Sequence, residues 1–305
     1  FNNITGAKQH VGNYAGVTVE KKEGHANFNG RDLLFIDLPG TYSLTARSLD
    51  ELVARNVIVN DNPDVIVNVL DASNLERNLY LAAQLLELEK PMVIALNMSD
   101  VAEEMGIKYD FKKMAELTGA TIVSTVGRTN IGTKELLEAT ISVAASQKAP
   151  GVTVNYGDLL EGKIAELVAA LEEAGTVTYP LRWIAIKLLE NDPDVVEKVK
   201  GFANTEAVLQ KAAAIREEIK DQVDLDIVFQ EYRHRYAVEV YNQSLTQAPK
   251  EIETRSDRYD KILTHRIWGL PIFMIVMYLL FAFVNIVGGI PQGWIEDGFA
   301  ALQAY

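Results

Sequence analysis

The feature that most constrains the fold is the run 267–295, which contains no charged side chain. A helix needs about 20 consecutive apolar residues to cross the hydrocarbon core of a bilayer, and the run supplies them up to Ile290. A basic stretch at 255–266 precedes it, and Trp268 stands at its start. The alternative is a buried core helix, but the lack of charge and the basic flank favour a transmembrane helix over 267–290.

The basic stretch also predicts the orientation of this span, because Lys and Arg beside a span are enriched on the cytoplasmic side. We therefore expect residues 1–266 to lie in the cytoplasm, with 251–266 as a basic juxtamembrane linker. Residues 291–305 would begin an extracytoplasmic segment. One span makes no pore by itself.

Composition excludes several kinds of site. The 305 residues include no cysteine, which rules out disulfides, thiolate metal sites and cysteine nucleophiles within them. The net charge of −13 makes nucleic acid a poor partner, because its phosphates attract clustered Lys and Arg. The length is enough for two or three domains.

Up to residue 148 the chain alternates between short apolar runs and helical patterns. Strands are predicted at 33–37, 65–70, 92–96 and 121–124, and helices at 49–60, 75–89, 111–117 and 133–145. Continuous apolar strands separated by helices are typical of a doubly wound α/β fold, in which a mostly parallel sheet is covered on both faces. A loop at 12–16, a strand at 17–22 and a turn-rich return at 25–30 predict one antiparallel edge strand.

The pattern changes after a Lys-Ala-Pro-Gly boundary at 148–151. Helical periodicity is predicted at 159–171, 181–189, 193–199, 205–219 and 223–241, and no strand is expected between about 155 and 250. The sequence therefore predicts an α/β domain at 1–148 and an all-helical domain at 152–250. His234, in one of these helices, is interpreted as structural.

The strand at 33–37 places Asp37 at its carboxyl end, and Gly40 follows. Ligands of open α/β sheets bind beyond the carboxyl ends of the strands. A carboxylate there suits Mg²⁺, and a glycine lets a backbone N–H approach a phosphate oxygen. A strand that ends in a Pro-Gly turn explains this segment alone equally well. Thr18 could add a hydroxyl ligand, although a solvated strand threonine is the favoured explanation of its segment.

Two later strand ends carry a pattern that fits guanine. Asn97 and Asp100 follow one strand, and a loop beginning at Ser124 follows the next. A carboxylate can accept hydrogen bonds from the N1–H and amino group of guanine, a pattern that adenine does not offer. Asn97 can brace the neighbouring loops. An N-x-x-D pattern is common by chance, but not at a strand end between a D-x-P-G segment and an S-T-x-G loop.

This order of motifs resembles that of P-loop GTPases. The segments 11–20, 37–44, 71–81, 97–100 and 264–271 together resemble the ferrous iron transport protein B (FeoB) family. The resemblance extends over essentially the whole chain and is specific as a set of motifs.

The resemblance implies a G domain that binds GTP or GDP with Mg²⁺. Thr18 would be the switch I threonine and Asp37 the switch II aspartate, both on the metal. Gly40 would sense the γ-phosphate, and with Thr18 and Thr41 it forms the implied catalytic set. The implied nucleotide-binding set is Gly16, Val17, Thr18, Val19, Glu20, Asp37, Leu38, Pro39, Gly40, Asn97, Met98, Ser99, Asp100, Ser124, Thr125 and Val126.

The chain departs from the GTPase pattern in two ways. It contains no G-x-x-x-x-G-K-S/T loop, which the family places just before a Leu-Phe-Asn that would end at Phe1-Asn2. As it stands, the chain is expected to bind nucleotide weakly or not at all. The K⁺ activation that the family implies is tied to a residue of that loop. Thr41 also stands where many GTPases carry a water-positioning Gln, so slow hydrolysis is expected.

The family carries Fe²⁺ across the bacterial inner membrane, and its helical domain is described as a GDP-dissociation-inhibitor-like element. The resemblance also implies a homo-oligomer and small accessory Feo proteins as partners, with the lipid bilayer around the span. Two other functions fit the motifs: a membrane-tethered GTPase switch that transports nothing, and a soluble ribosome-assembly GTPase with an apolar core helix. No iron ligand is identifiable in this sequence.

Overall fold

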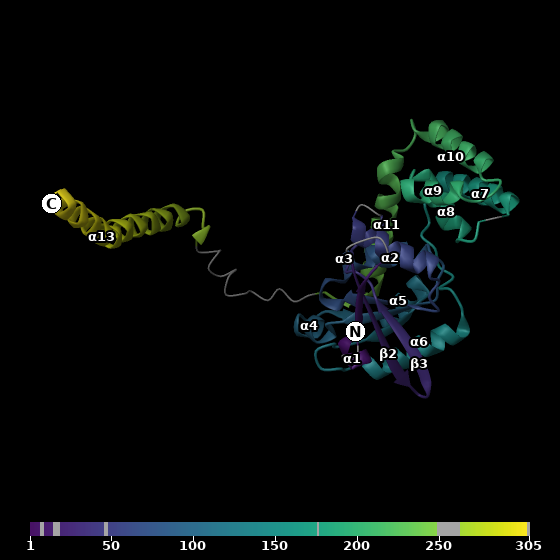
Figure 1. The fold of residues 1–305 in the computed structure, drawn as a ribbon, viewed down its shortest axis with the longest axis horizontal. Helices are drawn as coiled ribbons and strands as arrows, with labels where there is room; N and C mark the ends of the chain where they lie inside the picture. The colour runs from purple at the N-terminus through teal and green to yellow at the C-terminus, as the bar shows by residue number, and fades with distance from the viewer. Residues whose placement is uncertain (7–8, 15–18, 46–47, 176, 249–262, 304–305) are drawn as a thin grey trace. The chain divides into compact units, whose positions relative to one another are not determined.

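The structure, a computed structural model, describes residues 1–6, 9–14, 19–45, 48–175, 177–248 and 263–303, with side chains up to 287 except that of Gln9. It divides into two compact units, Phe1–Pro249 and Lys250–Tyr305 (Figure 1). The first unit contains both the α/β region and the helical region. The second contains the apolar helix.

A parallel sheet lies at the centre of the α/β region. Its strands are β4 (Ile66–Asp71), β5 (Met92–Asn97) and β7 (Thr121–Ser124), in the order β4-β5-β7. Alternate residues of β5 are buried on opposite faces. Ile94 and Leu96 belong to the core that contains α3 (Leu75–Leu86), whereas Val93 packs with Leu136 of α6 (Thr133–Ser146). The predicted fold class, a parallel sheet covered on both faces, is confirmed.

The antiparallel strands differ in detail from the prediction of one edge strand. Among the described residues, β1 (Gln9–Asn13), β2 (Glu20–Phe28) and β3 (Arg31–Asp37) form a three-stranded sheet of their own. The loop expected at 12–16 therefore begins within a strand. The turn expected at 25–30 shrinks to Asn29 and Gly30, whose φ angles of 50° and 76° suit a two-residue hairpin. β2 is rich in Lys and Glu, so it has no apolar run to reveal it.

The helices of the α/β region follow the expected pattern. α2 (Leu49–Asn60) begins at Ser48, whose hydroxyl accepts the N–H of Glu51 at 3.2 Å, as expected of an N-cap. The remaining elements are α1 (Asn2–Thr5), the single turn η1 (Ala72–Asn74), α4 (Ser99–Glu104) and α5 (Phe111–Thr118). α1 is closed by Gly6 in the left-handed conformation. α4, a helix of six residues, was not predicted.

Five helices make up most of the helical region. They are α7 (Gly157–Ala174), α8 (Leu181–Leu189), α9 (Pro193–Lys200), α10 (Glu206–Ile219) and α11 (Leu225–Ser244). The prediction of no strand in this region is wrong, because β8 (Leu245–Gln247) pairs antiparallel with β6 (Lys108–Tyr109). The Thr246 hydroxyl also donates to the Lys108 carbonyl at 3.0 Å. A strand this short, with so distant a partner, leaves no periodic signal.

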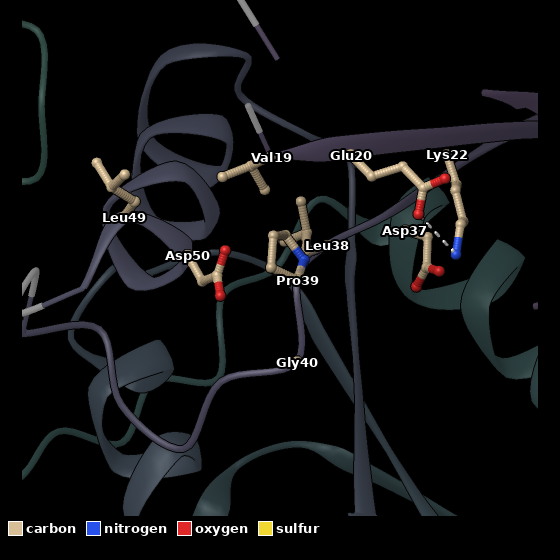
Figure 2. Close-up of a pocket in the computed structure, with 9 residues that line it drawn as sticks. All are labelled: Val19, Glu20, Lys22, Asp37, Leu38, Pro39, Gly40, Leu49 and Asp50. Carbon is tan, nitrogen blue, oxygen red and sulfur yellow. Dashed lines mark ion pairs between the residues drawn. The ribbon is translucent and has the colours of Figure 1, made fainter. Parts of the chain in front are cut away.

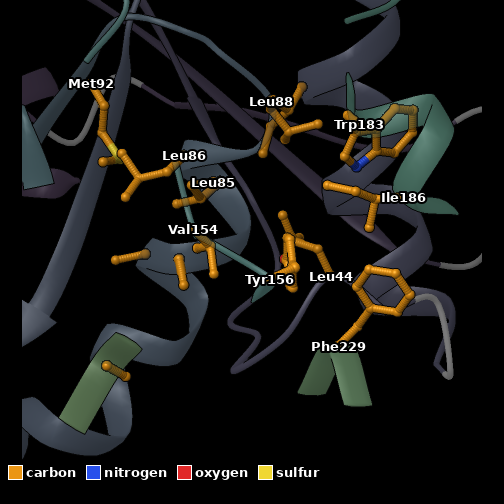
Figure 3. Packing of buried hydrophobic residues seen from close by; sticks show 14 of the residues in the cluster. Leu44, Leu85, Leu86, Leu88, Met92, Val154, Tyr156, Trp183, Ile186 and Phe229 are labelled. Carbon is orange, nitrogen blue, oxygen red and sulfur yellow. The ribbon is translucent and has the colours of Figure 1, made fainter. Parts of the chain in front are cut away.

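The α/β region and the helical region share one core. Leu86 and Leu88 from the first region belong to the same buried cluster as Trp183 and Phe229 from the second (Figure 3). Tyr156 lies in this cluster with its ring 4.9 Å from that of Phe229. The two regions are therefore packed as one body, and movement of either must rearrange this shared core.

The second unit contains α13 (Gly269–Gln303). Its segment Gly269–Val287 has a mean hydropathy of 2.5 and is long and apolar enough to cross a membrane. The described side chains of that segment are not buried in the protein, unlike those of a soluble core helix. The helix continues beyond residue 290, where the span was expected to end. Of the expected linker 251–266, residues 251–262 lie outside the described residues.

Candidate functional site

A cavity of about 610 Å³ lies at the end of β3, between the antiparallel sheet and the start of α2. Six residues expected to contact nucleotide meet there: Val19, Glu20, Asp37, Leu38, Pro39 and Gly40 (Figure 2). Lys22, Leu49 and Asp50 also line it, and sequence reasoning missed them. Lys22 could have been found, because a strand antiparallel to 33–37 must place some residue opposite Asp37.

The sheet register positions Asp37 within this cavity. Lys22 is its cross-strand partner, and the Lys22 ammonium lies 3.2 Å from the carboxylate of Glu20 (Figure 2). The backbone carbonyl of Asp37 accepts a hydrogen bond from the Tyr14 hydroxyl at 3.1 Å. Burial, followed by the charge of Asp37, raises the pKa of Tyr14 to about 12. Tyr14 therefore remains a donor at neutral pH and holds the end of β3.

The charges around the cavity fit a hydrated magnesium ion better than a protein-enclosed metal. Asp37, Glu20 and Asp50 all line it. Within the described residues, no three His, Cys, Asp or Glu side chains are grouped so that they could hold a metal by themselves. Mg²⁺ usually binds through one or two carboxylates and completes its shell with water and phosphate oxygens. Asp37 is placed to supply such a carboxylate.

A second constellation forms where β5 and β7 end side by side. Leu96 of β5 is in register with Ser124 of β7. The Asn97 side-chain oxygen accepts the backbone N–H of Gly127 at 2.9 Å, so the structure shows the expected brace. The Ser99 hydroxyl donates to the Thr125 carbonyl at 3.0 Å. These bonds join the two loops that follow the strands.

Asp100 stands in the first turn of α4, just beyond this brace. Met98, before the helix, adopts a left-handed conformation with φ 58°, which turns the chain between Asn97 and Asp100. The Asp100 carboxylate is partly exposed and lies 3.4 Å from the guanidinium of Arg128. A carboxylate held at the surface of two braced loops can accept hydrogen bonds from a planar ligand. Sequence reasoning did not identify Arg128.

Gly132 closes the same loop. It has φ 77°, and a Cβ at this position would stand 2.0 Å from the Ser124 carbonyl oxygen. Only glycine combines this φ with so close a backbone approach. The N–H of Val126 also donates to the Ile131 carbonyl at 2.9 Å, so 124–132 forms a compact turn. The position of Gly132 immediately before the predicted helix 133–145 was the available signal.

Three expected site residues cannot be placed. Gly16, Val17 and Thr18 lie outside the described residues, so their predicted contacts with nucleotide and metal stay predictions. Thr41 is partly buried immediately after Gly40, and its catalytic role also stays a prediction.

Two family descriptions match the chain. Residues 1–140 match "Ferrous iron transport protein B", and residues 156–246 match "FeoB cytosolic helical domain". The Fe(2+) transporter FeoB of Staphylococcus aureus is 38% identical over 92% of this chain and 42% of its own length. The chain spans about two fifths of the length of the curated relatives it matches.

Solved structures agree with this similarity. A mutant of S. thermophilus NFeoB bound to GDP is 32% identical, with a TM-score of 0.74 over 81% of this chain and 93% of the other. The cytosolic domain of the T. maritima FeoB iron transporter in its GMPPNP form is 29% identical, with a TM-score of 0.70 over 81% and 93% of the two chains.

Proposed function

This chain belongs to the ferrous iron transport protein B family, and on that premise we propose that it is the GTPase part and first membrane span of a bacterial Fe²⁺ transporter. In this proposal the first unit binds guanine nucleotide and hydrolyses GTP. α13 crosses the inner membrane, and Fe²⁺ is the cargo of the whole protein.

The observation that carries the nucleotide proposal is the brace between Asn97 and Gly127. It joins the loop that holds Asp100 to the loop of residues 124–126. Asp100 then reads the N1–H and amino group of guanine, while backbone N–H groups of the second loop are available to the guanine oxygen. The solved structures with GDP and GMPPNP are of similar domains, which supports the same ligand here.

The cavity at β3 is assigned to the γ-phosphate and the metal. Asp37 would hold Mg²⁺, with Thr18 as a further ligand, and Mg²⁺ supplies charge stabilisation to the phosphates when bound. The backbone N–H of Gly40 would contact the γ-phosphate. Thr41 offers no amide like that of a water-positioning Gln. Hydrolysis is therefore proposed to be slow, with the attacking water held mainly by backbone groups.

The membrane part of the proposal rests on α13 and on the names of the relatives. The span Gly269–Val287 has the required length and hydropathy, and the curated relatives are named as Fe(2+) transporters. The basic residues before it orient the first unit toward the cytoplasm. A homo-oligomer, accessory Feo proteins and K⁺ activation are further proposals that rest on the family alone.

The test is a fluorescent GDP titration of the cytosolic part, preceded by a G-x-x-x-x-G-K-S/T loop and ending before α13. Binding of GDP, ADP and XDP is compared in the wild type and in Asp100→Asn. We expect a preference for GDP that shifts toward XDP in the variant, because an amide can donate to the extra oxygen of xanthine. Equal affinities for GDP, ADP and XDP in both the wild type and Asp100→Asn would refute the assignment of Asp100.

A further inference from the structure

The segment that follows Gly40 is anchored on α3. Leu44 is buried, with 4% of its surface exposed, and its backbone N–H donates to the side-chain oxygen of Gln84 at 2.7 Å. Gln84 is itself only 3% exposed. A hydrogen bond between two such buried groups is costly to lose, because water cannot replace either partner.

A second contact lies closer to the cavity. The guanidinium of Arg77 stacks over the ring of Tyr42, with its central carbon 4.1 Å from the ring centroid. Arg77 and Gln84 are seven residues apart on α3, so they lie two turns apart on the same side of the helix. One face of α3 therefore holds the loop at Tyr42 and again at Leu44.

These anchors restrict the residues at the rim of the cavity. Tyr42 and Leu44 follow Gly40 by two and four residues, and each residue spans at most about 3.6 Å. Gly40 lines the cavity with Asp37. The chain before Gly40 is fixed as well, because Asp37 ends β3 and its carbonyl accepts the Tyr14 hydroxyl. The backbone of Gly40 and Thr41 is thus held on both sides.

Gln84 binds the loop after Gly40 through its side-chain oxygen, which accepts the N–H of Leu44. Its side-chain nitrogen is buried and has no hydrogen-bond partner among the described residues. A buried amide that leaves its donor unpaired is a poor choice for packing alone. The arrangement is explained if the requirement at this position is an acceptor for the N–H of Leu44.

We propose that Gln84, supported by Arg77, is a positioning residue for GTP hydrolysis. Gln84 fixes Leu44 and Arg77 fixes Tyr42, so the backbone of Gly40 and Thr41 keeps the geometry that the γ-phosphate and the attacking water need. This inference rests on the proposed function. It adds two residues that never touch the nucleotide and act through the loop.

The test compares Gln84→Met, Gln84→Glu and Arg77→Met in the full-length protein, with kcat and KM for GTP and Kd for GDP measured in each. Met keeps the volume of Gln84 but removes the acceptor, so we expect kcat to fall at least tenfold while Kd for GDP stays within twofold. Glu keeps an acceptor oxygen in place, so kcat should stay within threefold of the wild type. Thr140→Val is the matched control, since it removes a buried hydroxyl that donates to Leu136 within α6 at 2.7 Å.

The outcomes separate the inference from the function on which it rests. If the wild type shows no selective GTP hydrolysis, both are overturned. If the wild type hydrolyses GTP but Gln84→Met matches Thr140→Val in kcat, only the inference falls. A parallel loss of GDP affinity would also overturn it, because general loosening would then explain the result. Arg77 is exposed, so Arg77→Met should fold even if Gln84→Met does not. An unchanged kcat in that variant would count against the proposal.

Discussion

Arg55 is wholly buried on α2, and its guanidinium meets the carboxylate of Asp192 at 2.5 Å. A second carboxylate, Asp194, lies 2.8 Å from the same side chain. Asp192 also caps α9 by accepting the N–H of Val195. α2 begins at the cavity, where Asp50 lines the wall. One helix therefore joins the candidate phosphate site to the helical region through a buried ion pair.

Arg55→Met should destabilise the first unit strongly. Removing one partner of a buried pair leaves an uncompensated charge and costs about 3–5 kcal/mol. The free energy of unfolding, measured by urea titration, is the readout. Lys200→Gln is the control, because its pair with Glu197 is exposed and such pairs contribute about 0–1 kcal/mol. Equal effects of the two variants would contradict the buried pairing of Arg55.

The stability of the first unit should fall in acid because of Glu190. Burial alone would raise the pKa of Glu190, but the charges of Lys187 and Arg233 outweigh it and lower the pKa to about 2. The pKa of Glu190 is lower in the folded protein than in the unfolded chain, where it is near 4.5. Ionised Glu190 therefore stabilises the fold above pH 4.5, and this stabilisation is lost as the pH falls toward 2. The contribution is on the order of 3 kcal/mol.

The free energy of unfolding is measured between pH 6 and pH 2. This range includes the interval from about pH 5 to pH 2 in which paired carboxylates become protonated. Glu190→Gln should be less stable at pH 6 and should show a flatter decline. Glu172→Gln, exposed on α7, should follow the wild type. A Glu190→Gln curve parallel to the wild type would show that another carboxylate dominates.

Gly132→Ala should weaken guanine nucleotide binding. Its Cβ would clash with the Ser124 carbonyl at a positive φ, which costs about 1–3 kcal/mol and displaces the loop. We expect Kd for GDP to rise at least tenfold. Gly162→Ala is the control, because Gly162 lies within α7 with open space around it, and alanine there should stabilise the helix by roughly 0.5–1 kcal/mol. Unchanged GDP affinity in Gly132→Ala would show that the loop at 124–132 does not contribute to binding of the guanine base.

Thr41→Ala should leave GTP turnover nearly unchanged in the full-length protein, because the part of Thr41 proposed to act in catalysis is its backbone and not its hydroxyl. If backbone groups hold the attacking water, removing the Thr41 hydroxyl removes nothing that acts in the transition state. Single-turnover hydrolysis is the measurement. A loss of two or more decades would show that the hydroxyl itself takes part.

Leu279→Arg should impair membrane insertion of α13. Arginine at the centre of a span costs about 2.5–3.5 kcal/mol on insertion scales, and Leu279 lies midway along Gly269–Val287. Carbonate extraction of membranes from cells that express the chain with α13 gives the readout. Leu279→Ile is the matched control and should remain in the membrane fraction. Recovery of the unsubstituted span in the soluble fraction would refute the membrane assignment.

The sequence was sufficient for the elements that repeat a pattern. The apolar strand at Met92–Asn97 and the periodic helix at Leu75–Leu86 carry their own signals, because each buries a regular set of side chains. Asp37 and Asn97 were identifiable because each ends an apolar run in the sequence, although only the strand that ends at Asn97 is buried in the structure. The brace from Asn97 to Gly127 followed from the adjacency of parallel strand ends.

What could not be predicted depends on contacts between distant segments. β6 and β8 pair only two or three residues each, so neither has a period to detect. The acceptor role of Gln84 toward Leu44 crosses 40 positions in the chain, and nothing local distinguishes Gln84 from another helical glutamine. Tyr14 reaches Asp37 only through the register of the antiparallel sheet.

The pairing of β8 with β6 has a consequence for how this architecture can be recombined. The last strand of the helical region is completed by a strand of the α/β region, and the Asp110 N–H donates to the Ser244 carbonyl at the same place. The helical region is therefore not structurally independent of the α/β region. A chimera that exchanges it between relatives must carry matching versions of both strands, or it will leave an open edge on each side of the graft.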